Sequence, residues 1–146
     1  MDGIEIRRLG AGDLAVLDDV DPDTFDGPVI ARHAEAALTN PNHHLIVALD
    51  GARVVGFASG VHYTQPDKAP VLFVDEVGTA DAYQRRGIAT TLVRAILDHG
   101  RSLGCTEAWL LTEADNEPAR AFYAAIGGTE EDRPVYITFG LGPEAG

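Results

Sequence analysis

A glycine in residues 84–90 is the first feature of the sequence that points to a particular chemistry. Gly87 lies between a strand-like run and a long helical pattern. It lets backbone N–H groups approach a ligand because no side chain intervenes, and a helix start adds a positive dipole. These features favour a multiply charged anion such as a pyrophosphate. A general anion-binding turn would explain the glycine equally well.

Two common phosphate-binding motifs are excluded by the spacing of glycines. The sequence contains neither the GxxxxGK[ST] pattern of a P-loop nor the GxGxxG pattern of a dinucleotide-binding fold. ATP and NAD are therefore disfavoured as ligands of this segment.

Two adjacent carboxylates, Asp75 and Glu76, form the second feature with chemical potential. They lie in a strand-like run over residues 71–77. Side chains alternate between the two faces of a strand, which places Asp75 with Phe73 and Glu76 with Val74. The alternation predicts that only one of the two carboxylates faces a given cleft, and a charge at a strand end pointing to solvent remains the alternative for Asp75.

The elements that must position these residues form an α/β pattern. We expect strands at 4–9, 45–49, 54–61, 71–77, 106–112 and 135–141, and helices near Asp13, from Pro28 to about residue 38, at 88–103 and at 116–126. Asp50-Gly51 is a strong hairpin signal. The order predicts a largely antiparallel first half followed by at least one βαβ crossover. In the strand at 54–61, Gly56, Ala58 and Gly60 leave one face nearly bare, for either a ligand or a close-packed helix.

Composition limits the class of protein. A chain of 146 residues with 45% hydrophobic and 23% charged residues fits one soluble domain spanning 1–146. The formal net charge of -12 opposes binding to nucleic acid and anionic membranes. A single Cys105 and the absence of a signal-peptide pattern lead us to expect a cytoplasmic protein without a membrane span. The five histidines show no metal-ligand spacing, so no metal is expected.

Two motifs in register resemble the GNAT superfamily of N-acyltransferases. Residues 84–89 are similar to its acetyl-CoA signature, in which Gln or Arg is followed by two residues, Gly, any residue, then Gly or Ala. Residues 116–127 resemble its Asn-x-x-Ala-x-x-(aromatic or Leu)-Tyr-x-x-x-Gly pattern. Gly128 departs from the family, which usually carries Phe there, and this puts the packing of the last hairpin in doubt. Within the superfamily, the chain looks most like the bacterial aminoglycoside 3-N-acetyltransferases.

The resemblance implies a GNAT fold with a mixed, mostly antiparallel sheet that is splayed at its central strands. Acetyl-CoA is then the expected cosubstrate, with its thioester carbonyl polarised by a backbone N–H at Val77 or Thr79. The other expected cofactor-binding residues are Gln84, Arg85, Arg86, Gly87, Ile88, Ala89, Thr90, Asn116, Ala119 and Phe122.

Catalytic roles follow from the same resemblance. Glu76 lies eleven residues before Gly87, where many relatives carry a carboxylate, and is expected to take a proton from the acceptor ammonium or to hold the cation. Asp75 is its substitute if the strand register shifts by one. Tyr123 matches the position that protonates the departing thiolate in many relatives. Without the motif, a core position beside Phe122 would be the better explanation of Tyr123.

A cluster of further acidic residues suggests an anionic wall for an acceptor with several ammonium groups. Helix capping and turn formation explain individual aspartates equally well. The expected substrate-binding residues are Asp21, Asp23, Asp26, Asp75, Glu76, Glu113 and Asp115.

Three hypotheses about function follow. The first is an acetyl-CoA-dependent N-acetyltransferase for an aminoglycoside, at its 3-N position. The second is acetylation of another amine, such as a polyamine, an amino-acid derivative or a protein N-terminus. The third is a catalytically silent domain that binds acyl-CoA as a sensor. The resemblance also makes a homodimer one expectation, since relatives are often dimers.

Overall fold

The computed structural model describes residues 3–132 and 134–143 of the chain. It divides into two compact units, Met1–Leu111 and Thr112–Gly146. The first unit carries the sheet and its covering helices, and the second carries one further helix.

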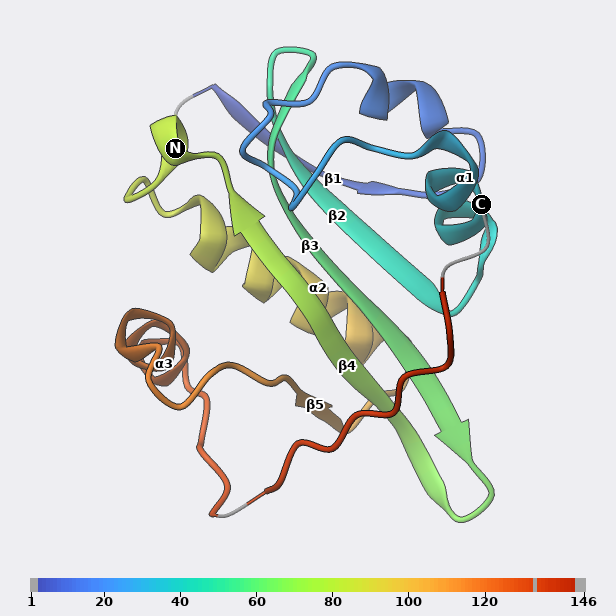
Figure 1. Ribbon diagram of the computed structural model, residues 1–146, viewed down its shortest axis with the longest axis vertical. Coiled ribbons are helices and arrows are strands. Elements are labelled where there is room, and N and C mark those ends of the chain that lie inside the picture. Colours follow the sequence, from blue (N-terminus) through green and yellow to red (C-terminus); the bar gives the residue numbers. More distant parts are fainter. Residues whose placement is uncertain (1–2, 133, 144–146) are drawn as a thin grey trace. The chain divides into compact units, whose positions relative to one another are not determined.

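A five-stranded sheet in the order β1-β2-β3-β4-β5 forms the centre of the first unit (Figure 1). The first four strands pair antiparallel, and β4 pairs parallel with β5. The α/β class, the antiparallel first half and the crossover are therefore confirmed. The strands are β1 (Ile4–Leu9), β2 (His43–Asp50), β3 (Arg53–Gln65), β4 (Lys68–Thr79) and β5 (Glu107–Trp109).

The turn between β2 and β3 is the hairpin predicted from Asp50-Gly51. Asp50 pairs with Arg53 across the turn, and Gly51 has a φ of +60°, a conformation that a side chain disfavours. Both strands run further than predicted, because their polar ends continue the ladder beyond the apolar runs.

Two hydrophobic clusters cover the two faces of the sheet. Helix α2 (Ile88–Ser102) packs Leu92 and Ile96 onto one face, in a cluster that includes Ala58. On the other face, η1 (Leu14–Asp18) and α1 (Ala31–Thr39) contribute Leu17 and Leu38. One face of the sheet is thus covered by the long helix α2, and the other by the two short helices η1 and α1.

The small residues of β3 allow α2 to approach closely. A Cβ at Gly56 would lie 3.2 Å from Leu92 Cδ1, and one at Gly60 would lie 3.3 Å from Ile96 Cδ1 and 2.6 Å from the carbonyl oxygen of Phe73. Of the two interpretations of the bare face, the close-packed helix is therefore correct.

The two N-terminal helices differ from expectation. The first is a short 3-10 helix, and the Asp13 side chain accepts a hydrogen bond from the backbone N–H of Gly10 at 2.8 Å instead of capping the following turn. The second begins at Ala31, not near Pro28. The β-branched pair Val29 and Ile30 has low helix propensity, and Ile30 is extended at φ -104° and ψ 113°. The helix ends at Thr39, close to the predicted end near residue 38.

In the second unit, α3 (Glu117–Ala125) begins as predicted. The side-chain oxygen of Asn116 accepts a hydrogen bond from the Ala119 N–H at 3.1 Å and caps the helix. After the helix, the Gly128 N–H donates to the Tyr123 carbonyl at 2.8 Å. A Cβ at Gly128 would lie 2.9 Å from that same oxygen, so this turn favours the glycine that departs from the family pattern.

The prediction of a last strand at 135–141 is wrong. The strand predicted at 106–112 forms, but β5 is shorter than expected. No strand occurs in the described residues 134–143. Val135, Phe139 and Leu141 are 80%, 82% and 95% exposed. Alternating apolar residues specify a strand only where a partner edge pairs with it, and the described part of the second unit contains no other strand.

Candidate active site

A cavity of about 380 Å³ lies on the face of the sheet opposite α2. The loop before α1 and α1 itself form one side, and β2, β3 and β4 form the other. Its apolar lining includes Phe25, Val29, Ile30, Ala34, Leu45 and Phe57. Its polar lining consists of Asp26, His33, His43, Ser59, Asp75 and Glu76. The cavity therefore offers charge and apolar surface together, as small-molecule sites usually do.

A β-bulge in β4 brings both carboxylates of the predicted pair to this cavity. Ser59 pairs with Glu76, but the next residue of β3, Gly60, pairs with Val74, which leaves Asp75 without a partner in the ladder. A bulge of this kind shifts the alternation of side chains by one residue. The prediction that only one of Asp75 and Glu76 can face a given cleft is therefore wrong.

The electrostatics of the cavity change the proton affinity of its groups. Partial burial raises the pKa of Glu76 above its usual value, and the nearby carboxylates of Asp26 and Asp75 raise it further. Burial also lowers the pKa of His43, which Asp75 partly offsets. Glu76 is thus a stronger proton acceptor than an exposed glutamate, and His43 is mainly neutral at pH 7.

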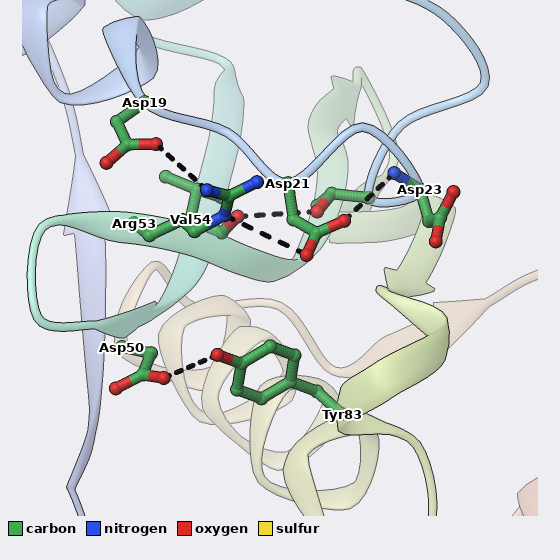
Figure 2. Close-up of polar contacts among 8 residues, drawn as sticks. Asp19, Asp21, Asp23, Asp50, Arg53, Val54 and Tyr83 are labelled. Atoms are coloured by element: carbon green, nitrogen blue, oxygen red, sulfur yellow. Dashed lines mark hydrogen bonds and ion pairs between the residues drawn. The ribbon is translucent and has the colours of Figure 1, made fainter.

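The other acidic residues of the N-terminal loop are arranged differently. Asp26 lines the cavity, but Asp21 and Asp23 are not among its lining residues. Asp21 pairs with Arg53 at 3.8 Å, and the Asp23 N–H donates to the Asp21 carboxylate at 3.2 Å. Figure 2 shows these contacts as dashed lines. Arg53 also pairs with Asp19 at 3.8 Å. Asp21 therefore anchors the loop that carries the cavity wall.

The start of α2 has the geometry expected of an anion-binding turn. Gly87 is its N-cap with a φ of +80°, and a Cβ there would meet nothing within 4 Å. The glycine is thus favoured by the backbone conformation and not by packing. The N–H groups of Ile88, Ala89 and Thr90 occupy the first turn, where no intrahelical acceptor is available. They are free to bind an anion at an exposed helix start.

The side chains of this segment serve the fold more than a ligand. The Gln84 amide donates to the Thr79 carbonyl at 3.4 Å and to the Asp81 carboxylate at 3.3 Å. The Arg86 guanidinium lies 5.1 Å from the centre of the Tyr83 ring, whose hydroxyl donates to Asp50 (Figure 2). The Ile88 side chain is buried in the core. Arg85 has a φ of +63°, which is uncommon for a residue other than glycine.

One edge of β4 is open beyond its contact with β5. The parallel pairing ends at Phe73 and Trp109, whereas β4 continues to Thr79. Among the described residues, no strand pairs with this edge from Val74 onward. Such a separation is the expected splay. Val77 and Thr79 lie on this part of β4, and the Thr79 hydroxyl is buried without a hydrogen-bond partner among the described residues.

The remaining candidate residues belong to the second unit. Tyr123 and Phe122 lie on α3 with ring centres 5.0 Å apart. Burial raises the pKa of Tyr123, so it retains its proton at neutral pH. Glu113 and Asp115 are exposed residues in the turn before α3, where the Asn116 N–H donates to the Glu113 carbonyl at 3.0 Å.

Sequence reasoning missed three polar residues of the cavity: His33 of α1, and the two sheet residues His43 and Ser59. A sequence signal existed for the two sheet residues. The signal that could have found them is the alternation itself. His43, Leu45 and Val47 share one face of β2, and Ser59 and Phe57 share the matching face of β3. The longer strands in the structure extend this face to His43.

The family is now shown by direct comparison. The sequence model of the acetyltransferase (GNAT) family matches residues 14–127, which is well over half of the chain. The chain belongs to the GNAT acetyltransferase family.

Relatives of known name fall into several acetyltransferase groups. Over 110 residues the chain is 29% identical to aminoglycoside N(6′)-acetyltransferase type 1 of Serratia marcescens, covering 72% of this chain and 75% of that protein. Over 88 residues it is 38% identical to mycothiol acetyltransferase of Corynebacterium glutamicum strain R, covering 60% of this chain. The match spans only 29% of that longer protein. These aminoglycoside relatives are 6′ enzymes, so the resemblance to 3-N enzymes in particular finds no support.

Solved structures confirm the fold. An aminoglycoside acetyltransferase from an uncultured soil metagenomic sample, in complex with trehalose, matches with a TM-score of 0.80 at 22% identity, covering 97% of this chain and 98% of that one. AAC(6′)-Iy in complex with a CoA bisubstrate analogue matches with a TM-score of 0.77 at 21% identity, covering 94% and 99%.

Two further properties concern the described residues alone. No helix there is long and apolar enough to cross a membrane. Within the same residues, no three His, Cys, Asp or Glu side chains gather as ligands for a metal ion would.

Proposed function

We propose that this chain is an acetyl-CoA-dependent N-acetyltransferase whose acceptor is an aminoglycoside or a closely similar amino sugar. The observation that carries the proposal is the cavity beside β4, in which the bulge gathers Asp75 and Glu76 opposite Asp26. Three carboxylates around one small cavity suit a cationic amine. The GNAT family and the named aminoglycoside relatives support the reaction and the acceptor class.

The proposed reaction begins with the acceptor in its ammonium form. Glu76 takes a proton from the ammonium, directly or through a water, and the free amine attacks the thioester carbonyl carbon. A backbone N–H at the open edge of β4, near Val77 or Thr79, stabilises the oxyanion. The raised pKa of Glu76 suits it to the role of base, and Asp75 holds the cation beside it.

The second half of the reaction breaks the carbon–sulfur bond. The thiolate of CoA leaves with the bonding electron pair and takes a proton, for which Tyr123 is the proposed donor. The attacking nitrogen gives up its second proton to solvent as the amide forms. A phenol whose pKa is raised by burial is fully protonated at pH 7. The backbone N–H groups at the start of α2 hold the pyrophosphate of acetyl-CoA, with Gly87 permitting the approach.

Mycothiol acetyltransferase activity is the second candidate. A relative of that name in Nocardioides is 35% identical over 94% of this chain, although the match covers only half of that protein. The acceptor would then be the amine precursor of mycothiol. Both candidates require a cation at the same carboxylates. Activity measurements with different acceptor amines, and not the geometry of the site, therefore separate them.

The test is release of CoA thiol from acetyl-CoA in the presence of single amines. The panel contains kanamycin A, the amine precursor of mycothiol, putrescine and a peptide with a free N-terminus. We expect the highest kcat/KM for kanamycin A, and the position of the new acetyl group follows from NMR of the product. Release of no thiol with any amine would contradict the enzymatic proposal and favour an acyl-CoA sensor.

Glu76→Gln sharpens the assignment of the base. We expect kcat to fall about 100-fold, because a general base typically contributes 10² to 10⁴ to the rate, while KM changes little. The acidic limb of the wild-type pH profile rises as Glu76 loses its proton, so the variant should have a flat profile there. Asp75→Asn is the matched control and should mainly raise KM for the acceptor. A rise in KM without a fall in kcat in Glu76→Gln would show instead that Glu76 only holds the acceptor cation.

A further inference from the structure

The side chain of His43 lines the cavity and makes no hydrogen bond at its Nδ1 atom among the described residues. His43 is the first residue of β2, pairs with Val61 of β3, and lines the cavity with Ser59 and the two carboxylates of β4. Its Nδ1 atom is buried and has no hydrogen-bond partner among the described residues. Buried polar atoms are nearly always paired in folded proteins, so this imidazole is maintained at a cost to stability.

The protonation of His43 follows from its surroundings. Burial lowers its pKa, so the neutral ring with a single N–H predominates at pH 7. A buried N–H without a partner is rarer in proteins than a buried acceptor without one. The proton therefore belongs on Nε2, at the other edge of the ring, and Nδ1 keeps its lone pair. Of the two ring nitrogens, Nδ1 is the one that is buried without a partner among the described residues, which leaves Nε2 as the atom that can meet a ligand in the cavity.

We propose that His43 determines specificity for a hydroxylated amine by donating a hydrogen bond from Nε2 to an oxygen of the acceptor. The carboxylates of Asp75 and Glu76 take the ammonium group, and His43 takes the neighbouring hydroxyl or ring oxygen. This inference rests on the proposed N-acetyltransferase function and narrows its substrate class. An amino sugar satisfies both sets of groups, whereas a bare polyamine satisfies only the carboxylates.

The experiment compares two variants of His43 on two acceptors. His43→Leu removes the donor, and His43→Gln keeps an amide N–H near the position of Nε2. With kanamycin A, we expect His43→Leu to raise KM about five- to tenfold, the effect of one neutral hydrogen bond, and His43→Gln to restore most of it. With putrescine, neither variant should change KM. His62→Leu is the control, because it removes an imidazole from the other face of the same sheet.

Two further measurements make the outcome decisive. The imidazole nitrogen signals of His43 in ¹⁵N NMR should shift on addition of kanamycin A and not on addition of putrescine. Thermal unfolding should show His43→Leu folded and at least as stable as the wild type, because an unpartnered polar atom has been removed. Equal effects of Leu and Gln, equal effects on both acceptors, or an unmoved NMR signal would each overturn the inference. If the wild type transfers acetyl to kanamycin A while the His43 variants match it, only this inference fails. If the wild type releases no thiol with any amine, the proposed function fails first.

Discussion

Two adjacent histidines on β2 face opposite sides of the sheet and have opposite relations to the fold. His44 is 5% exposed, and both of its ring nitrogens are used. Its Nε2 lies 2.7 Å from Nδ1 of His62, and its Nδ1 lies 3.1 Å from Nε2 of His99. His43 lines the cavity with a buried nitrogen that has no hydrogen-bond partner in the described part of the chain. On the α2 face, the imidazole of His44 thus links β2 to β3 and α2. On the cavity face, the imidazole of His43 remains available to a ligand.

The comparison extends to the whole of the two faces. The α2 face is closely packed, with Leu72, Leu92 and Ile96 almost fully buried. On the opposite face, the loop before α1 leaves a cavity with three carboxylates. Stability and ligand binding are therefore expected to respond to mutations on different faces.

Leu92→Ala should produce the largest effect, and on stability alone. Leu92 is fully buried beneath α2, and replacement of such a leucine by alanine costs about 3 to 4 kcal/mol through lost burial and a residual cavity. Urea unfolding measures it. Ile30→Ala, which removes an exposed side chain from the cavity wall, is the matched control and should cost less than about 1 kcal/mol. Equal losses would contradict the division between the faces.

Acidification should destabilise the protein through His44. Burial and the neighbouring His99, His62, His43 and Arg8 lower the pKa of His44 to about 4. Since the unfolded chain binds this proton near pH 6.5, it holds more protons than the folded protein between pH 6.5 and 4. The free energy of unfolding should therefore fall as the pH falls through this range, by about 3 kcal/mol at most from this group.

The measurement is urea unfolding at intervals from pH 7 to pH 4. His44→Leu, which cannot take up the proton, should show a shallower loss over the same range. The lowered pKa values of His43 and His99 add a smaller slope of the same sign to both proteins. If the free energy of unfolding has the same pH dependence in the wild type and in His44→Leu, then His44 does not control the response to acid.

The parts of the fold that local chemistry determines could be predicted from the sequence. Gly87 and the long helix after it, the hairpin at Gly51 and the helix start at residue 116 all follow from local residue types at one position. The bulge at Asp75 could not be predicted, because it depends on the register between β3 and β4. A shift of one residue there exchanges the faces of every side chain that follows.

The acidic residues show the same limit at the site. Asp21 and Asp26 are the same residue type in the same loop, so the sequence does not distinguish their roles. Asp21 pairs with Arg53, whereas Asp26 lines the cavity. The contacts that separate them join residues about thirty positions apart. Pro28 likewise predicted a helix start, but Val29 and Ile30 instead extend the chain along the cavity.

Arg53→Ala should have the smallest effect, and it tests whether the cavity face depends on the ion pairs that anchor its loop. Arg53 pairs with Asp19 and Asp21 at 3.8 Å (Figure 2), and its side chain is 46% exposed. Exposed pairs of this kind contribute less than about 1 kcal/mol, so the midpoint of urea unfolding should barely move. The loop that these pairs anchor leads to Asp26 and Ile30, so KM for a cationic acceptor should rise about twofold, and high salt should remove the difference. Arg101→Ala is the matched control, because it removes an exposed ion pair within α2. An equal rise in KM in both variants would attribute the effect to net charge and not to the anchored loop.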